Sequence, residues 1–162
     1  MTGMTNVGWP NSAAPGLSAF RLDVPSEWSQ IEPAGALVAF LAPAAGEFRM
    51  SLTVYGERMP ADIELGVAAE NTLLVAGAHE IVAIGVDGSE GEDQLPSAAR
   101  RADIQQDGSL VRHLAVTTEA PDRSKTGMRS VYALVGACLT AHADIDEHTL
   151  TEMISSFTIT GS

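Results

Sequence analysis

The segment FRLDVPSEW, Phe20 to Trp28, together with the two strand-like segments after it, decides the fold that we expect for this chain. Large apolar residues alternate with charged ones from Phe20 to Val24, which predicts a strand with one buried face. Pro25 has no backbone N–H to donate, so it ends that strand, and a short turn follows. The next segment, ALVAFLAP at residues 36 to 43, is continuously apolar and predicts a strand that is covered on both faces.

A second alternating segment, FRMSLTVYGERM at residues 48 to 59, predicts a long half-buried strand. It places Phe48, Met50, Leu52 and Val54 on one face and Arg49, Ser51, Thr53 and Tyr55 on the other. After Pro60 the apolar period changes from strand to helix, and we expect a helix over residues 61 to 77. Its buried stripe is predicted to consist of Ile63, Val67, Leu74 and Ala78.

The second half of the chain predicts a hairpin, a buried strand and a closing helix. Asp107-Gly108 lies between SAARRADIQQ and SLVRHLAVTT, and such a dipeptide is the strongest short-range signal for a two-residue hairpin turn. MRSVYALVGACLT, residues 128 to 140, has the composition of a strand covered on both faces. The last helix is predicted to begin with Asp144 as cap and Glu147 three positions later. Its buried stripe is Leu150, Met153, Ile154 and Phe157.

The length and composition fit one domain. With 162 residues and 45% hydrophobic content, the chain is long enough for a single core. Residues 1 to 18 are rich in small and polar residues without hydrophobic periodicity, so we expect a flexible amino-terminal tail followed by one domain over residues 19 to 162. Trp9 is the exception in this tail, because a large aromatic side chain favours docking on the domain or on a partner.

The charge of the chain excludes several kinds of partner. A net charge of -12 repels phosphate backbones and anionic lipid headgroups, so we expect neither nucleic acid nor a membrane surface as a partner. No segment reaches the ~18 apolar residues of a membrane span, and the first residues lack the pattern of a secretory signal. We therefore expect a cytoplasmic protein. The single cysteine, Cys138, lies in an apolar run and is expected to be buried.

The order of these elements resembles the PsbP-like α/β/α sandwich over residues 19 to 160. FRLDVPSEW resembles the opening of the bacterial LpqN and DcrB type proteins, and LTEMISSFTI resembles their closing helix. The resemblance implies an α+β fold, a three-layer α/β/α sandwich with a mostly antiparallel central sheet flanked by helices. It also implies that Pro25 and Trp28 are structural positions, since in this family they close the first strand and pack the core.

The same resemblance implies a function in binding. The fold occurs in lipid-anchored envelope proteins, an extrinsic photosystem subunit, a nuclear import factor and the Eag-type chaperones of bacterial secretion systems, most of which act by binding. The sequence departs from the lipoprotein branch because it shows neither a signal peptide nor a lipobox cysteine. The cytosolic branch is the better match.

One cluster of side chains has the chemistry of a metal site. His142, Asp144, Asp146 and His148 combine imidazole with carboxylate, which suits zinc or another divalent ion. The start of the closing helix explains the same residues by capping and solvation, and this explanation is favoured. We therefore predict no metal and no cofactor, with these four residues as the weak candidates.

Two further features have a plain explanation. The loop containing Asp87, Glu90, Glu92 and Asp93 offers oxygen ligands for calcium but lacks the regular ligand spacing, so a solvated loop is favoured. His113 lies on a predicted strand, where it could act as a general base in a cleft, yet no motif places a nucleophile beside it. The G-x-S-x-G, G-x-G-x-x-G, P-loop and H-E-x-x-H motifs are all absent from the sequence.

These observations predict a non-catalytic protein-binding module, a chaperone or adaptor for a secreted or membrane-destined protein. Its partner is expected to be a basic or amphipathic polypeptide, held on an exposed sheet face or in a groove beside the first helix. The binding residues are predicted to be Trp9, Tyr55 and Met59, surrounded by an acidic rim. A homodimer paired along an exposed sheet edge is also considered. The alternatives are a small-ligand carrier with a pocket between sheet and helix, and a metal-dependent enzyme that uses His113 or the histidine and carboxylate cluster.

Overall fold

The structure is a computed structural model, which describes residues 3–9, 19–44, 48–88, 96–120 and 127–160. Its main element is a seven-stranded antiparallel sheet with the strand order β3-β4-β5-β9-β8-β7-β6. A second sheet has three strands in the order β1-β2-β10. The strands of the larger sheet are β3 (Ser29–Ile31), β4 (Val38–Leu41), β5 (Ser51–Pro60), β6 (Val82–Gly88), β7 (Ser97–Gln106), β8 (Ser109–Glu119) and β9 (Met128–Leu139). The remaining elements are β1 (Met4–Trp9), β2 (Phe20–Pro25), β10 (Thr158–Ile159), α1 (Leu65–Val75), the 3-10 turn η1 (Thr140–His142) and α2 (Ala143–Ser155).

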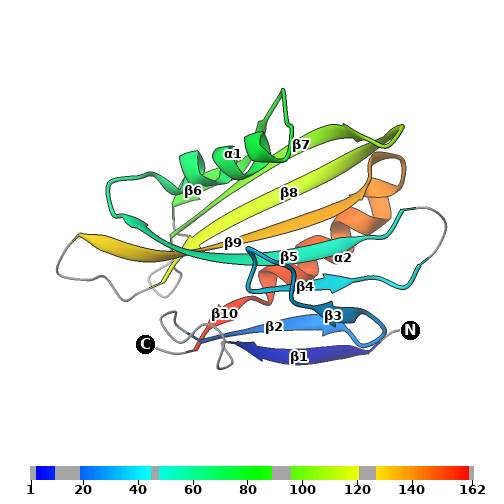
Figure 1. The fold of residues 1–162 in the computed structure, drawn as a ribbon, viewed down its shortest axis with the longest axis horizontal. Helices are drawn as coiled ribbons and strands as arrows, with labels where there is room; N and C mark the ends of the chain where they lie inside the picture. The colour runs from blue at the N-terminus through cyan, green and yellow to red at the C-terminus, as the bar shows by residue number, and fades with distance from the viewer. Residues whose placement is uncertain (1–2, 10–18, 45–47, 89–95, 121–126, 161–162) are drawn as a thin grey trace.

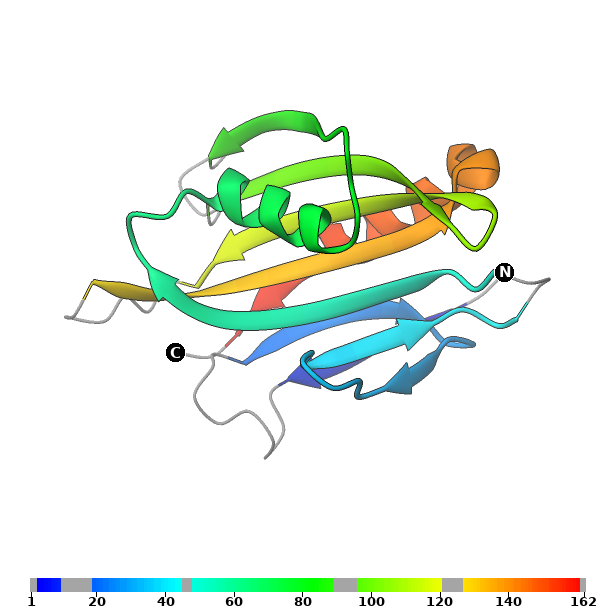
Figure 2. The same ribbon diagram turned by 45° about the horizontal axis from the view of Figure 1, so that its top comes forward.

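The two α-helices of the described chain lie on opposite faces of the larger sheet. Figure 2 shows α1 in front of β7 and β8 and α2 behind the sheet. Side chains on β8 agree with this arrangement, because Thr117 Oγ1 donates a hydrogen bond to the Leu65 carbonyl of α1, whereas Arg112 pairs with Glu147 of α2. The predicted three-layer α/β/α sandwich is therefore correct only in part, since sheet dominates the molecule and the helices cover only part of it.

The main core lies between the larger sheet and the layer formed by α2 and the three-stranded sheet (Figure 1). Phe20, Leu22 and Val24 of β2 are buried in it, as the alternation in the sequence predicted. Leu52 and Val54 of β5 are fully buried in the same core, so the predicted inward face of that strand is also correct. Its aromatic part is formed by Phe20, Tyr132 and Phe157, whose ring centroids are 5.0 to 5.4 Å apart.

The β7–β8 hairpin has the predicted two-residue turn. Asp107 has φ 48° and Gly108 has φ 84°, so both central residues are left-handed, as a type I′ turn requires. The register continues from Gln106↔Ser109 to Ser97↔Thr118.

The first helix is shorter than predicted and turns a different face to the sheet. It runs from Leu65 to Val75, and its buried residues are Leu65, Gly66, Ala69 and Leu73. Val67 and Leu74 of the predicted stripe are instead 43% and 54% exposed. Ala69 and Leu73 instead pack against the alanine-rich surface of β7 and β8, where Ala102 and Ala115 are buried.

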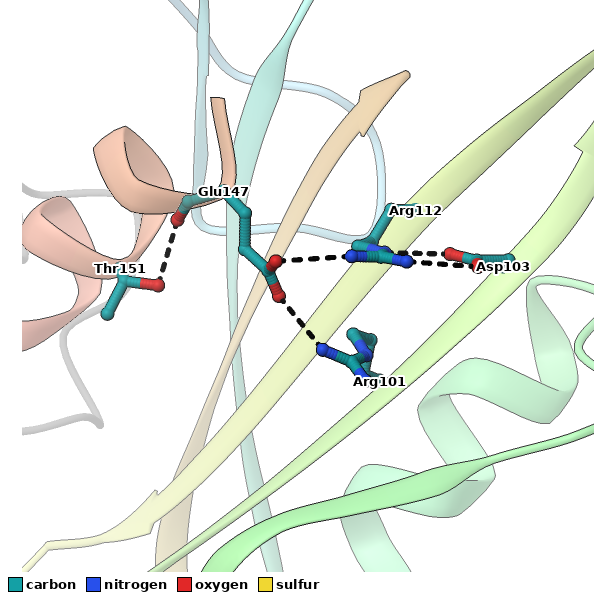
Figure 3. A network of polar contacts seen from close by, with 5 residues as sticks. All are labelled: Arg101, Asp103, Arg112, Glu147 and Thr151. Carbon is teal, nitrogen blue, oxygen red and sulfur yellow. Dashed lines mark hydrogen bonds and ion pairs between the residues drawn. The ribbon is translucent and has the colours of Figure 1, made fainter. Parts of the chain in front are cut away.

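The second helix has the predicted buried stripe but a different amino-terminal end. Leu150 and Met153 are fully buried, and Ile154 and Phe157 are partly buried. The predicted cap is wrong, because His142 occupies the cap position without a side-chain hydrogen bond and Asp144 lies in the first turn. Figure 3 shows that Glu147 points away from the helix end toward the arginines of β7 and β8.

Glu147 ties α2 to the sheet through ion pairs. Its Oε2 accepts a hydrogen bond from Arg112 Nη1 at 3.2 Å, and its Oε1 lies 3.5 Å from Arg101 Nη1. Arg112 also donates two hydrogen bonds to the Asp103 carboxylate, at 2.9 and 3.2 Å. The hydrogen bond from Arg112 is the main reason why the pKa of Asp103 is below its usual value.

The amino-terminal segment differs from the predicted tail in its first part. Met4 to Trp9 form β1, which pairs with β2 in the register Met4↔Pro25 to Trp9↔Phe20. β1 is held by backbone hydrogen bonds to the edge of β2, and such bonds do not require a periodic pattern of apolar residues. For this reason the composition of the segment did not predict a strand. Residues 10–18 lie outside the described part of the chain.

Two remaining predictions concern burial and membrane spans. Cys138 is fully buried, as predicted, and burial raises the pKa of its thiol to about 11. None of the described helices has the length and apolar character needed to cross a bilayer.

Candidate binding groove

The candidate site is a groove on the face of the larger sheet that carries α1. We call it the α1 groove. It has a volume of about 670 Å³, which is within the range of ~300–1,000 Å³ typical of ligand sites. Because α1 lies over β7 and β8, the neighbouring strands β9 and β5 are left uncovered on this face (Figure 2). The groove is lined by Ser51, Thr53, Tyr55, Glu57, Arg58, Met59, Pro60, Ile63, Ala68, Asn71, Thr72, Val75, Ala76, His113, Thr117, Val131, Ala133, Val135 and Ala137.

The floor of the groove follows from the strand register. Directly opposite residues of an antiparallel sheet point to the same face, so the floor consists of rows that run from β8 across β9 to β5. The middle row is Thr117–Ala133–Tyr55, and the row at one end is His113–Ala137–Ser51. At the other end Val131 and Glu57 line the groove, and the same row continues to Glu119 of β8, which is not part of the lining. From Val131 to Ala137 the floor is about 20 Å long, at roughly 3.3 Å per strand residue.

Small residues on β9 create the depth of the groove. Ala133 lies between Thr117 and Tyr55, and Ala137 lies between His113 and Ser51, so β9 is lower than its neighbours in these two rows. The helix α1 forms the wall above β8. The opposite side is bounded by Tyr55, which is 38% exposed. Val75, at the end of α1, lines the groove and is 90% exposed. An apolar molecule in the groove would therefore contact alanine and valine below, and larger apolar residues at the sides.

The structure places two of the three predicted binding residues in this groove. Tyr55 lies on its rim, and Met59 lies near its end, where it also packs against Leu65 and Val131. The third predicted residue, Trp9, belongs to β1, whose strand partner is β2 and not any strand of the groove. The side chain of Trp9 lies outside the part of the structure that is described.

His113 is the polar residue at the Ser51 end of the groove. It is only 8% exposed. Its Nε2 lies 3.2 Å from Gln106 Oε1, whereas its Nδ1 is buried and has no hydrogen-bond partner among the described residues. Burial lowers the pKa of the imidazole, and the nearby charge of Asp103 opposes this effect only in part. His113 is therefore a neutral imidazole at physiological pH.

The other end of the groove is next to a buried ion pair. Arg129 Nη1 lies 3.1 Å from Glu119 Oε2, and the two side chains are 6% and 7% exposed. Arg129 also donates a hydrogen bond to the Ile63 carbonyl, which precedes α1. The pair fixes the start of the helix segment to β8 and β9, so it positions one end of the groove. Glu57 is the acidic residue of the described lining, and Arg58 lies next to it.

A second groove lies on the opposite face of the sheet, beside α2. It has a volume of about 810 Å³ and includes Ile84, Ala99, Val116 and Phe157 in its lining. Glu147 and Thr151 add polar groups to it. Its floor carries side chains of β7 and β8 that α2 leaves uncovered, so it is separated from the α1 groove by the sheet itself.

The predicted metal ligands are not brought together. No group of three or more histidine, cysteine, aspartate or glutamate side chains in the described ranges could hold a metal ion. His148 instead pairs with Glu152 on the exposed side of α2, at 3.0 Å. His142, Asp144 and Asp146 do not form a ligand set with it. In the acidic loop, Glu90, Glu92 and Asp93, and the side chain of Asp87, lie outside what the structure describes.

Several groove residues were missed by the sequence analysis. Ala133, Val135 and Ala137 had been assigned to a strand covered on both faces, and Ala68, Asn71 and Val75 had no assigned role. The alternation of small and larger residues in VYALVGA, residues 131 to 137, is the only local signal. This alternation indicates that β9 carries short side chains on one face. The sequence does not show where α1 lies, and the helix is needed to make that face a groove.

Comparisons with known proteins bear on the fold. No family model matches the sequence, and no curated protein does. The crystal structure of LpqN, described as involved in cell envelope biogenesis of Mycobacterium tuberculosis, is similar with a TM-score of 0.67 and 15% identity, over 97% of this chain and 91% of that one. The solution structure of cyanobacterial PsbP from Synechocystis is similar with a TM-score of 0.61 and 11% identity, over 96% of this chain and 92% of that one. The chain therefore has the PsbP-like fold that the sequence predicted.

Proposed function

We propose that this chain is a non-catalytic binding protein whose α1 groove holds an apolar segment of a polypeptide partner. The observation that carries the proposal is the groove itself, an apolar trough about 20 Å long at ~3.3 Å per residue, beside α1. A trough of this length accommodates roughly six residues of extended chain or about thirteen residues of helix.

Apolar surface beyond the groove favours a polypeptide over a compact molecule. Val67 and Leu74 are half-exposed on α1. They lie close in sequence to Ile63 and Val75, which line the groove and are themselves exposed. Exposed apolar residues gathered on one element mark interaction sites more often than chance exposure does. A polypeptide that enters the groove could contact this outer surface of α1 as well.

The charge distribution supports a basic or amphipathic partner. The chain has 9 basic and 21 acidic residues, and Arg100, Arg101, Arg112 and Arg129 are all held in internal ion pairs. The acidic excess therefore remains on the surface, where it attracts a partner of opposite charge.

The chemistry of the groove supports binding over catalysis. His113 is the one imidazole in the described lining, and its side-chain partner is Gln106, not a hydroxyl or thiol. General-base activation of a nucleophile would require such a group within hydrogen-bond reach. Cys138 lies on the opposite face of β9, with its thiol pKa raised.

The likeness to LpqN, a protein described as involved in cell envelope biogenesis, supports an envelope-related role for the partner. We accordingly propose a chaperone or adaptor that binds a secreted or membrane-destined polypeptide. An exposed apolar segment of such a client would be shielded from water in the groove.

The test is affinity purification of the tagged full-length chain from its native host, with a groove-filling variant and a matched control. Ala133→Trp fills the middle row of the α1 groove, and Ala99→Trp places the same side chain in the groove on the opposite face. We expect a stoichiometric polypeptide with the wild type and with Ala99→Trp, and its loss with Ala133→Trp. Circular dichroism and thermal melting check that both variants are folded.

Two results would refute this function. Either no polypeptide is retained by the wild type, or the polypeptide is retained equally by Ala133→Trp. Isothermal titration with the purified partner segment then measures the expected loss of affinity, at least tenfold for Ala133→Trp.

The second candidate function is a carrier of a small apolar ligand. The volume of about 670 Å³ favours it, because drug-sized and metabolite-sized molecules fit in such a space. Native mass spectrometry of the protein purified from its host distinguishes the two: a carrier shows a small added mass without a polypeptide partner.

A further inference from the structure

The strand β6 is an edge of the larger sheet, and its first half is exposed and uncharged. Among the described strands only β7 pairs with it, and Figure 2 shows it as the outermost strand beyond β7. Ala83 and Gly85 are exposed, and Val82 and Ile84 are 51% and 37% exposed. Edge strands of natural proteins usually carry a charge or a proline that prevents the addition of another strand. The stretch from Val82 to Val86 contains neither, so this edge is open to strand addition.

The hairpin turn between β7 and β8 determines which backbone groups of β6 point outward. In a two-residue hairpin the residues that flank the turn, Gln106 and Ser109, exchange both of their backbone hydrogen bonds, and such pairs recur at every second residue. Arg100 is an even number of residues from Gln106, so its N–H and C=O groups point to β8. Ala83 lies opposite Arg100 in the register. The N–H and C=O groups of Ala83 therefore point away from β7, to the open edge.

The side chains on either side of Ala83 lie at the mouth of the groove beside α2. Val82 and Ile84 point to the α2 face of the sheet, since Ala99, opposite Ile84, lines that groove. One row across the sheet, entirely within the lining of the groove, consists of Ile84, Ala99, Val116 and Leu134. This row reaches the edge of the sheet at Ile84, so an apolar side chain on an added strand would extend the floor of the groove.

Charges at the two ends of the stretch indicate the kind of partner. Glu80 is exposed just before β6, and Asp87 follows the uncharged stretch in the sequence. Antiparallel pairing of two β6 strands about Ala83 would bring the Glu80 end of each copy next to the Asp87 end of the other, and like charges on facing strands are destabilising. The net charge of -12 adds to the repulsion between two copies. A polypeptide with basic residues fits this edge better than a second copy of the chain.

We propose that the open edge of β6 at Ala83 is a docking site for an extended polypeptide segment, which adds as an antiparallel strand and carries basic residues at its ends. The residue opposite Ala83 exchanges two backbone hydrogen bonds with it, and the neighbouring residues place apolar side chains beside Val82 and Ile84. Backbone pairing supplies affinity and the side-chain positions supply specificity, as in other cases of strand addition. The shift in register after Ile84 ends the regular edge, so the site takes one short segment. This site does not depend on the α1 groove or on its occupant.

The probe is the peptide Lys-Thr-Thr-Val-Thr-Val-Thr-Lys with blocked ends, whose two valines are designed to lie beside Val82 and Ile84. Its affinity for the full-length, isotope-labelled protein is measured by titration at low salt, followed through the amide spectra. A control peptide with proline between the valines lacks the N–H that pairs with Ala83, and it should bind about tenfold more weakly or less. A second control with glutamate at both ends should bind about three- to tenfold more weakly, and this difference should decrease in 1 M salt.

Two variants assign the binding to the backbone of Ala83. Ala83→Pro removes the outward N–H, and proline is tolerated on an edge strand where that N–H faces solvent. We expect this variant to lose the binding of the probe. Ala83→Thr keeps the N–H and should retain the binding. Circular dichroism and thermal melting check that both variants are folded.

Hydrogen exchange in the wild type keeps the test independent of any variant. The Ala83 amide should exchange quickly in the free protein and slowly with the probe bound. The amides of Val82 and Ile84, which point to β7, should be protected in both states. These are the results that the docking site predicts.

Several results would overturn the proposal. No binding of the probe, equal binding of the proline control, or binding retained by a folded Ala83→Pro would show that no strand adds at this edge. Equal binding of the glutamate control would overturn the basic partner. Protection of the Ala83 amide that increases with protein concentration alone would show that a second copy occupies the edge. None of these results bears on the loss of a polypeptide in Ala133→Trp, so the two proposals fail separately.

Discussion

The contact between Gly136 and Leu150 makes the packing of α2 on the sheet measurable. A Cβ atom added at Gly136 would lie 3.1 Å from both Cδ atoms of Leu150 and 3.3 Å from its Cγ. These distances are shorter than ordinary van der Waals contact, so Leu150 would have to shift by a few tenths of an ångström. Leu150 is fully buried, and the ion pairs of Glu147 hold α2 down one turn earlier. We therefore expect that a shift of the Leu150 side chain or of α2 would lower the free energy of unfolding.

The magnitude for Gly136→Ala is a balance of two effects. Overpacking a core costs typically 1–3 kcal/mol. Replacing glycine by alanine in a strand recovers roughly 0.5–1 kcal/mol, since the unfolded chain loses conformational freedom. The expected net result is a decrease of about 1 kcal/mol in the free energy of unfolding.

A double-mutant cycle separates the two effects. Leu150→Ala alone leaves a cavity and should cost about 2–5 kcal/mol. In that background the added methyl group of Gly136→Ala enters free space, so the same substitution should become stabilising by about 0.5–1 kcal/mol. The expected coupling free energy is thus about 2 kcal/mol.

The assay is urea denaturation of the four proteins, followed by tryptophan fluorescence and circular dichroism. Additive effects within about 0.5 kcal/mol would show that Leu150 does not restrict residue 136, which refutes the packing argument. Gly136 lies on the α2 face of β9, opposite to the α1 groove. The retention of a polypeptide partner should consequently be the same in Gly136→Ala as in the wild type.

Three further predictions follow from single side chains. Glu147→Gln should lower the free energy of unfolding by about 1 kcal/mol at low salt. The decrease should be smaller in 1 M salt, because the pair of Glu147 with Arg112 is partly exposed and is screened by ions. An unchanged urea midpoint at low salt would contradict this prediction. The folded-state pKa of His113 is lowered below 6.5, so the unfolded state binds more protons as the solution is acidified. Its contribution to stability is therefore complete above pH 6.5 and declines as the pH falls from 6.5 toward the folded-state pKa, and His113→Phe should lose this pH dependence in urea titrations. Cys138 is fully buried with a thiol pKa of about 11, so a disulfide reagent at pH 8 should react with it only after denaturation; rapid reaction with the native protein would contradict the burial.

Elements with strong local periodicity were predictable from the sequence. The β2 and β5 strands, the Asp107-Gly108 turn and the buried stripe of α2 each depend on side chains close together in the chain. In all four cases the local signal and the tertiary environment agree, which is the situation in which sequence patterns are informative.

Features that depend on distant segments were not predictable in the same way. The buried face of α1 was assigned wrongly because hydrophobicity favours Val67 and Leu74, whereas the helix packs on the alanine-rich sheet through Ala69 and Leu73. Glu147 has the spacing of a capping residue, yet it pairs with arginines that lie 35 and 46 positions earlier in the chain. Local spacing cannot show which of two polar roles a carboxylate takes.

The existence of the α1 groove follows from the widths of the two kinds of element. Seven strands at about 4.8 Å spacing form a sheet roughly 29 Å wide, and one helix with its side chains is about 10 Å wide. A single helix can thus cover only two or three strands of each face. On the α2 face the three-stranded sheet adds Phe20, Leu22 and Val24 as further cover.

On the α1 face, the described chain has no such second layer over β9 and β5. Yet β9 has the composition of a strand covered on both sides, with Val131, Ala133, Val135 and Ala137 facing the groove. Val131 and Ala137 are buried, at 3% and 8% exposed, whereas Ala133 and Val135 are half-buried. The part of these apolar side chains that water reaches costs free energy unless another molecule covers it. The occupant of the α1 groove, in the function that we propose, supplies the cover that a second helix would otherwise provide.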